Sequence, residues 1–283
     1  MDSVQQLARR SPAARLAKAA LVRGQALAGA VRGGPVRPGL RILYYHRISA
    51  ERDPLAVTPD AFRRQMDALE ASGQRVVDLY EIDELTLAPG EAAIALTFDD
   101  GYRDVLQHGL PVLRRHGFPS TVFVVPGAIA GTCRFSWYAE GATTPPLASW
   151  DELREQEQTG LVHFEPHTLT HPVLTTLSLE DARREIADSK QAVEDELGRP
   201  ARIFCYPFGY HSLREVELVR ESGYRAAVTC EYGANSAPFA HNELRRTIVA
   251  RSDPLWLFRA RLAGATDAPP PGRRTRRVER LAA

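Results

Sequence analysis

Short apolar runs alternate with helical patterns along most of this 283-residue chain, and this alternation limits the possible folds more than any other feature. The runs typical of strands are 40–45, 75–79, 92–98, 120–125, 161–165, 202–206, 224–229 and 244–249. The helical patterns are 62–72, 105–116, 149–158, 178–197, 213–222 and 254–262. Strands that alternate regularly with helices form parallel sheets. We therefore predict an α/β fold, a closed or nearly closed (β/α) barrel of seven or eight units, with an open doubly wound sheet as the alternative.

Charge is distributed unevenly and divides the chain into three parts. The formal net charge is +1, but residues 1–38 carry +6 and residues 267–283 carry +3, which leaves −8 on residues 39–266. We expect a basic, Ala-rich N-terminal extension (1–38), a barrel domain (39–266) and a disordered Pro/Arg-rich tail (267–283). The acidic body argues against a nucleic-acid-binding protein, whereas the basic extension could make peripheral contact with an anionic membrane.

The cysteines and the apolar runs indicate in which cellular compartment we expect the protein. No run of about 18 apolar residues predicts a transmembrane helix, and Arg15, Lys18 and Arg23 interrupt any signal-peptide core. Three cysteines without a CxxC pair support neither a disulfide framework nor a tetrathiolate zinc site. We expect a cytoplasmic protein or a peripheral protein of the inner leaflet.

Reactive side chains follow three of the predicted strands. Two carboxylates, Asp99 and Asp100, come directly after 92–98, and two imidazoles, His167 and His171, come just after 161–165. A Gly-bounded turn, 207–209, follows 202–206. In (β/α) barrels the loops at the carboxyl ends of the strands build the active site, so we expect these groups to lie together.

The spacing of these groups favours a catalytic metal site. Adjacent residues of a strand point to opposite faces, so Asp99 and Asp100 can take different roles. A helical turn would place His167 and His171 on one face. Asp100 with the two imidazoles would leave positions open for water and substrate, and Asp99 could then act as a base. The sequence lacks the Glu of HExxH metalloproteases, and Asp100 lies on a different strand from the histidines, unlike the carboxylate of iron oxygenases.

Three motifs together resemble the polysaccharide deacetylase family, the NodB-homology group or carbohydrate esterase family 4. They are TFDDGY (97–102), HTLTHP (167–172) and YPFG (206–209), and the opening YYHRI (44–48) is also similar. The resemblance covers about residues 40–262 and implies a distorted (β/α) barrel. It also implies metal-dependent removal of N-acetyl, sometimes O-acetyl, groups from sugars, usually with one zinc ion. By motif, Asp99 is the implied base, and Asp100, His167 and His171 are the implied ligands. The backbone N–H of Phe208, where Tyr is commoner, is the implied oxyanion donor.

Two positions depart from the family pattern. Cys205 stands where an Arg commonly pairs with the catalytic Asp, and we expect Arg246 either to replace that Arg or to form a merely structural ion pair. A late Leu-x-His, whose imidazole protonates the leaving amine, is missing. His46 could reach the site from the end of the first strand, but the acid stays unassigned.

The resemblance predicts an N-acetylated glycan as the substrate. We expect His46, Tyr102, Tyr206, Pro207 and Trp137 to contact it, although Trp137 could instead pin the loop 131–146 to the barrel. The first hypothesis is a hydrolase that deacetylates an N-acetylhexosamine in a polysaccharide or glycoconjugate. The alternatives are a catalytically impaired glycan-binding protein of the same fold and a membrane-associated component of a surface-glycan synthesis system. The particular glycan, the choice of N- or O-acetyl, and the oligomeric state stay open.

Overall fold

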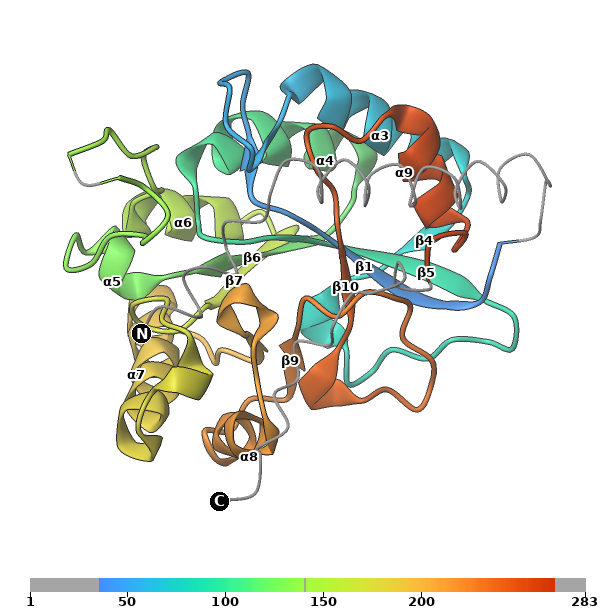
Figure 1. Cartoon of the computed structure of the whole chain (residues 1–283). Coiled ribbons are helices and arrows are strands. Elements are labelled where there is room, and N and C mark those ends of the chain that lie inside the picture. The colour runs from blue at the N-terminus through green and yellow to red at the C-terminus, as the bar shows by residue number, and fades with distance from the viewer. Residues whose placement is uncertain (1–35, 140, 268–283) are drawn as a thin grey trace, which may run out of the picture.

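The computed structural model describes residues 36–139 and 141–267, and parallel strands form its centre (Figure 1). Five strands lie side by side in the order β10–β1–β5–β6–β7, and every neighbouring pair is parallel. Their bounds are β1 (Gly39–Tyr45), β5 (Ala92–Phe98), β6 (Ser120–Val124), β7 (Val162–Pro166) and β10 (Arg246–Ile248). The short strand β4 (Arg75–Val76) joins the same sheet by pairing with the first half of β5, on the edge that β6 uses further along.

Two further strands complete most of a ring. β8 (Ile203–Cys205) and β9 (Ala226–Val228) form a separate parallel pair, and a parallel bridge from Val228 to Leu244 connects this pair to the approach to β10. β8 lies beside β7, but within the described residues no ladder of hydrogen bonds joins them. The molecule is therefore a distorted (β/α) barrel with one open seam, and the predicted fold class is confirmed.

Helices cover the outside of this ring. α3, α4 and α9 lie on one side of the sheet, and α7 and α8 lie on the other (Figure 1). The α-helices are α3 (Pro59–Ala71), α4 (Leu110–His116), α5 (Pro126–Ile129), α6 (Trp150–Glu157), α7 (Leu179–Leu197), α8 (Leu213–Glu221) and α9 (Leu255–Leu262). The helix expected over 105–116 begins as the π-turn η2 (Val105–Gly109), and α4 starts at Leu110, because Pro111 has no N–H to continue the first ladder. The remaining elements are β2 (Arg47–Ile48), β3 (Ala56–Val57), η1 (Leu79–Glu81), η3 (Leu174–Thr176), η4 (Pro207–Gly209) and η5 (His241–Glu243).

The strands are apolar on both faces because two cores sandwich them. Ile42 of β1 and Ala95 of β5 belong to the cluster inside the barrel, together with Phe123 and Val228. Their neighbours along the strands, such as Leu43 and Leu96, belong to the cluster between the sheet and the helices. This double burial explains why 92–98 reads as a continuous apolar run.

The expected terminal segments lie almost entirely outside the described residues. At the margins, the N–H of Arg37 donates to the Ala263 carbonyl, and the Arg41 guanidinium forms a two-point ion pair with Asp267 at 2.8 and 3.0 Å. Among the described helices, none has the length and apolar character needed to cross a bilayer.

Candidate active site

A cavity of about 850 Å³ opens at the carboxyl ends of the strands. The sequence-predicted residues that line it are His46, Asp99, Asp100, Trp137, His167, His171 and Phe208. The motifs that follow β5, β7 and β8 therefore meet in one place, as the strand-end argument predicted.

Asp99 and Asp100 diverge because the chain turns sharply between them. The N–H of Asp99 donates to the Tyr45 carbonyl at 2.9 Å and extends the β5–β1 ladder by one residue. Asp100 then adopts a left-handed conformation with φ 76°, and Gly101 follows with φ 72°. A Cβ at Gly101 would lie 3.1 Å from Cγ1 of Val124, so glycine suits this close approach.

The two histidines meet through a bend, and the expected helical turn is wrong. His167 continues β7, with its N–H donating to Val124 of β6 at 2.8 Å. Thr168 and His171 then take left-handed φ values of 64° and 63°, which no helical turn contains. Glu185 of α7 holds the bend by accepting hydrogen bonds from the backbone N–H and the hydroxyl of Thr170. The bend returns the second imidazole to the first, with 3.1 Å between the two Nε2 atoms.

Asp100, His167 and His171 form a buried set of donor atoms. Oδ1 of Asp100 lies 3.7 Å from Nε2 of His171 and 3.9 Å from Nε2 of His167. Nδ1 of His167 lies 2.7 Å from the Cys205 carbonyl, which can only accept, so Nδ1 carries the proton and Nε2 the lone pair. Burial lowers the pKa of His167 to about 4 and the pKa of His171 well below its usual value, so both rings are neutral at pH 7.

This donor set fits a divalent cation. Oδ2 of Asp100 is buried and has no hydrogen-bond partner among the described residues. Burial and the charge of Asp99 raise the pKa of Asp100 well above its usual value, and a cation bound beside this carboxylate would oppose both effects. One carboxylate and two neutral imidazoles are the ligand types of open, catalytic zinc sites.

Asp99 instead faces Arg246 of β10. The fully buried guanidinium donates to both carboxylate oxygens, at 2.7 and 2.9 Å, and its Nε donates to the Thr229 carbonyl. Burial raises the pKa of Asp99, but the charge of Arg246 and its hydrogen bonds to the carboxylate oppose this effect, and the pKa lies below its usual value. Asp99 is therefore ionised at neutral pH.

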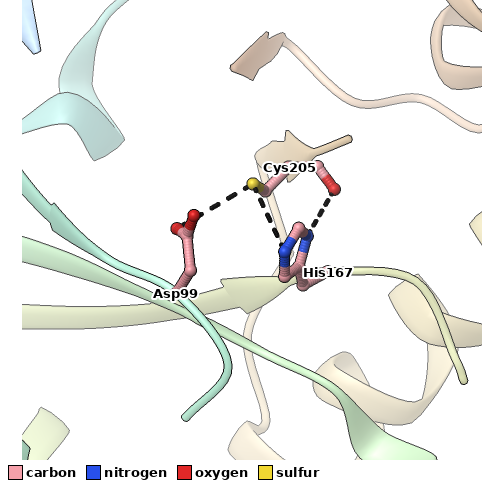
Figure 2. A group of neighbouring side chains, drawn as sticks. All are labelled: Asp99, His167 and Cys205. Atoms are coloured by element: carbon pink, nitrogen blue, oxygen red, sulfur yellow. Dashed lines mark hydrogen bonds between the residues drawn. The ribbon is translucent and has the colours of Figure 1, made fainter. Parts of the chain in front are cut away.

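The thiol of Cys205 lies between the side chains of Asp99 and His167 (Figure 2). Its Sγ is 3.0 Å from Nη2 of Arg246, 3.8 Å from Nε2 of His167 and 4.0 Å from Oδ1 of Asp99. Asp99, His167 and Cys205 thus form a second group of possible metal donors, which shares Nε2 of His167 with the first. The Arg246 guanidinium contacts both Asp99 and the thiol, and its positive charge would repel a cation bound there. Burial also raises the pKa of the thiol, which disfavours the thiolate that a metal needs. The set with Asp100 is the one that suits a metal.

Backbone strain concentrates at this site. Within the described ranges, the non-glycine residues with positive φ are Asp100, Thr168, His171 and Phe208. Phe208, in η4, has φ 56°, and its ring centroid lies 4.8 Å from that of His171. Such conformations persist only where the surroundings enforce them, and they gather at functional sites.

Three residues expected to contact substrate do not line the cavity. Tyr102 and Tyr206 are fully buried, and their hydroxyls bond to Tyr138 and to the Asn242 carbonyl. Pro207 is buried as well. Proximity to a motif does not determine which way a side chain points, and contact of these three residues with substrate stays a prediction.

Sequence reasoning also missed one wall of the cavity. Residues 51–55 and Tyr138 line it. The buried Arg47 holds the segment 51–55 through ion pairs to Glu51 and Asp53. A third ion pair, to Asp104, fixes the guanidinium itself. The acidic residues four and six positions after Arg47 were the only sequence pattern that could have indicated these ion pairs. Trp137 both lines the cavity and stacks on Phe135, with ring centroids 4.5 Å apart.

Comparison with known proteins identifies the family. The model of the polysaccharide deacetylase family matches residues 87–227. The Bacillus subtilis (strain 168) protein YxkH, provisionally named a polysaccharide deacetylase, is 28% identical over 214 residues, which cover 75% of this chain and 71% of that protein. The poly-β-1,6-N-acetyl-D-glucosamine N-deacetylase of Staphylococcus epidermidis is 23% identical over 235 residues, 74% of this chain and 78% of that protein.

A solved structure agrees with the sequence matches. IcaB from Ammonifex degensii superposes with a TM-score of 0.69 at 26% identity and covers 80% of this chain and 97% of its own. The chain belongs to the polysaccharide deacetylase family, which is a family of hydrolases.

Proposed function

We propose that this protein is a metal-dependent hydrolase that removes N-acetyl groups from an N-acetylhexosamine in a polysaccharide or glycoconjugate. The observation that carries the proposal is the pairing of two buried groups at one end of the barrel. The Asp100–His167–His171 donor set lies beside an ionised Asp99, and both line the same cavity. A pure binding protein would need the donors but not the base.

The donor set would hold one divalent cation, and its nitrogen and oxygen atoms suit zinc. Such a cation supplies positive charge beside the acetyl carbonyl and makes water a stronger acid. Asp99 would accept the proton of the attacking water, because Arg246 keeps it ionised. The backbone N–H of Phe208 would donate to the carbonyl oxygen as negative charge develops on it.

The variant Arg246→Met tests whether Asp99 is the base, because it should change the pH dependence of kcat/KM. Arg246→Met removes the largest influence that opposes the burial of Asp99, so the pKa of Asp99 rises and a larger share of the base is protonated. We expect the acidic limb of kcat/KM against pH to move upward by about one unit or more. The measurement is a pH–rate profile of the metal-loaded variant.

Arg261→Met is the matched control, because Arg261 is a buried arginine paired with Asp253 and does not line the cavity. Arg261→Met should lower the melting temperature and leave the acidic limb of kcat/KM against pH at its wild-type position. A profile of Arg246→Met that superposes on the wild-type profile would assign Arg246 a structural role only.

His46 is our candidate for the acid that protonates the leaving amine. It follows β1, it is only partly buried, and it lines the cavity without belonging to the donor set. It lines the same cavity as Asp99, His167 and His171, so it faces the space where the reacting groups would meet. Imidazole is the side chain that most often transfers protons in general acid–base catalysis.

His46→Ala should therefore lower amide turnover by about 10²–10⁴-fold and leave metal content unchanged. An aryl acetate ester is the internal comparison, because a phenolate leaves without being protonated. We expect a much smaller loss with the ester. Equal losses on amide and ester would show that His46 does not act as the acid.

Acetate release decides the function as a whole. The panel comprises poly-β-1,6-N-acetylglucosamine, chitin oligomers and peptidoglycan fragments, each with added zinc and with a chelator. We expect zinc-dependent acetate release from at least one glycan. Glycan binding without acetate release from any of them would favour the impaired glycan-binding alternative.

A further inference from the structure

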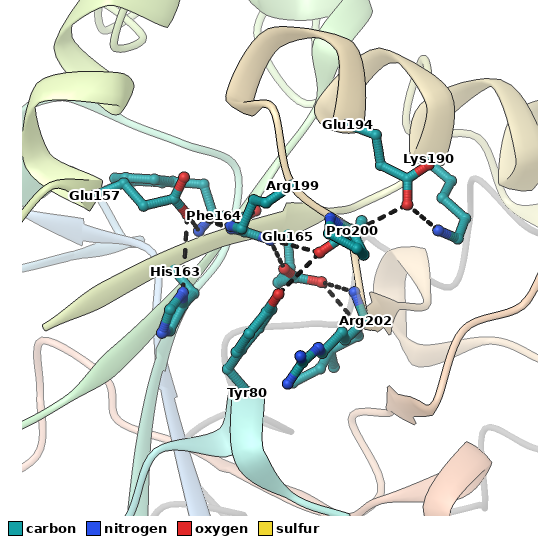
Figure 3. Close-up of polar contacts among 12 residues, drawn as sticks. Tyr80, Glu157, His163, Phe164, Glu165, Lys190, Glu194, Arg199, Pro200 and Arg202 are labelled. Carbon is teal, nitrogen blue, oxygen red and sulfur yellow. Dashed lines mark hydrogen bonds and ion pairs between the residues drawn. The ribbon is translucent and has the colours of Figure 1, made fainter. Parts of the chain in front are cut away.

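The seam between β7 and β8 is closed by side chains. Glu165 of β7 is fully buried, and its Oε2 accepts the backbone N–H groups of Arg202 at 2.7 Å and of Ile203 at 2.6 Å (Figure 3). One carboxylate oxygen thus satisfies the N–H groups of the residue before β8 and of its first residue, where a neighbouring strand would normally supply carbonyls. Without it, the buried N–H of Ile203 and the partly buried N–H of Arg202 would lose this partner.

A cationic frame holds Glu165 in place. Arg199 donates to Oε1 of Glu165 at 2.6 Å, to the Phe164 carbonyl at 2.8 Å and to the carboxylate of Glu157. Its guanidinium lies 4.9 Å from the centre of the Tyr80 ring, and the Tyr80 hydroxyl donates to the Pro200 carbonyl at 3.0 Å. The segment that enters β8 is therefore fixed on both sides of the carboxylate (Figure 3).

His167 crosses the same seam two residues further along. Residues two apart on a strand point to the same face, so Glu165 and His167 share a direction. Glu165 binds the N–H of Ile203, and His167 donates from Nδ1 to the carbonyl of Cys205, also two residues further along. The two side chains therefore impose one register between β7 and β8, which no backbone ladder supplies among the described residues.

We propose that Glu165 is a positioning residue for His167. By setting the register of β8, it places the Cys205 carbonyl that fixes the protonated nitrogen of His167 and turns Nε2 toward Asp100 and His171. This inference rests on the proposed metal-dependent function. Groups that orient a ligand in this way typically contribute about 10–100-fold to metal affinity.

Glu165→Gln tests the proposal through metal affinity, without any activity measurement. The amide keeps the shape, but it has a single acceptor oxygen, so its NH2 group must face either the N–H groups of Arg202 and Ile203 or the Arg199 guanidinium. It also loses the charge that Arg199 binds. We expect the zinc dissociation constant, measured by chelator competition below the melting temperature, to rise about tenfold or more. The visible spectrum of the cobalt-loaded variant should change as well, because the His167 ligand is reoriented.

Glu157→Gln is the matched control. Glu157 binds the same Arg199 guanidinium but does not contact β8 through any described hydrogen bond. It should lose stability and keep wild-type zinc affinity and cobalt spectrum. Should Glu165→Gln fail to fold, Arg199→Lys, which removes the support of Glu165 and keeps a positive charge, takes its place with the same expected direction.

Two results would overturn the inference. One is a folded Glu165→Gln, or Arg199→Lys in its place, with wild-type zinc affinity. The other is an equal loss of affinity in Glu157→Gln, which would indicate general loosening of the network. Failure of the proposed function looks different, because the wild-type protein itself would then bind no zinc.

Discussion

Asp99→Asn is expected to lower turnover by about 10²–10⁴-fold, with the zinc affinity of the protein nearly unchanged. The amide keeps the size of the side chain but cannot take a proton from water. Both Asp99 oxygens bond to Arg246, and the proposed ligand set uses Asp100 instead. The measurement pairs kcat on the best glycan of the panel with zinc content per folded chain.

Stability must be separated from catalysis in this variant. Removing the charge of Asp99 leaves Arg246 buried and unpaired, and breaking a buried ion pair costs about 3–5 kcal/mol of unfolding free energy. Asp253→Asn is the control, because it strips the buried Arg261 of its carboxylate away from the cavity. It should lose stability comparably and keep its turnover. Wild-type turnover in Asp99→Asn would show that the base is a different group.

The barrel could be predicted from sequence because its signal is local. The run 92–98 matches β5 residue for residue, and the pattern 178–197 differs from α7 by one residue. Both elements are long enough for their hydrophobic period to be read. The two-residue strands β2 and β3 and the four-residue helix α5 were not predicted, because such short elements show no period and depend on tertiary contacts.

The members of the proposed site could be predicted, but not how the chain arranges them. The motif spacing indicated Asp99, Asp100 and both histidines, yet the route from His167 to His171 is a strained bend. Glu185 supports that bend from 14 residues beyond His171, where a local pattern cannot show it. Glu165 was read as the end of a strand. Its importance depends on β8, 38 residues later, and is visible only when the seam is seen in three dimensions.

His171→Ala is expected to remove the metal and the activity together. The variant keeps Asp100 and His167, but a site of two protein ligands should bind zinc at least about a hundredfold more weakly, since the binding energy of such sites is shared among a few ligands. His116→Ala is the control: it removes another buried imidazole, one that packs near Asp67 and Glu70 outside the cavity.

The readout that separates lost binding from lost folding is the zinc dependence of stability. A ligand that binds the native state at 100 times its dissociation constant raises the unfolding free energy by about 2.7 kcal/mol. Wild type and His116→Ala should therefore melt at a higher temperature with zinc than with chelator, whereas His171→Ala should melt at one temperature in both. Because the same imidazole would both bind the cation and shape the catalytic site, turnover should fall in parallel. A His171→Ala protein that still gains stability from zinc at the wild-type concentration would place the cation elsewhere and would exclude this donor set as its site.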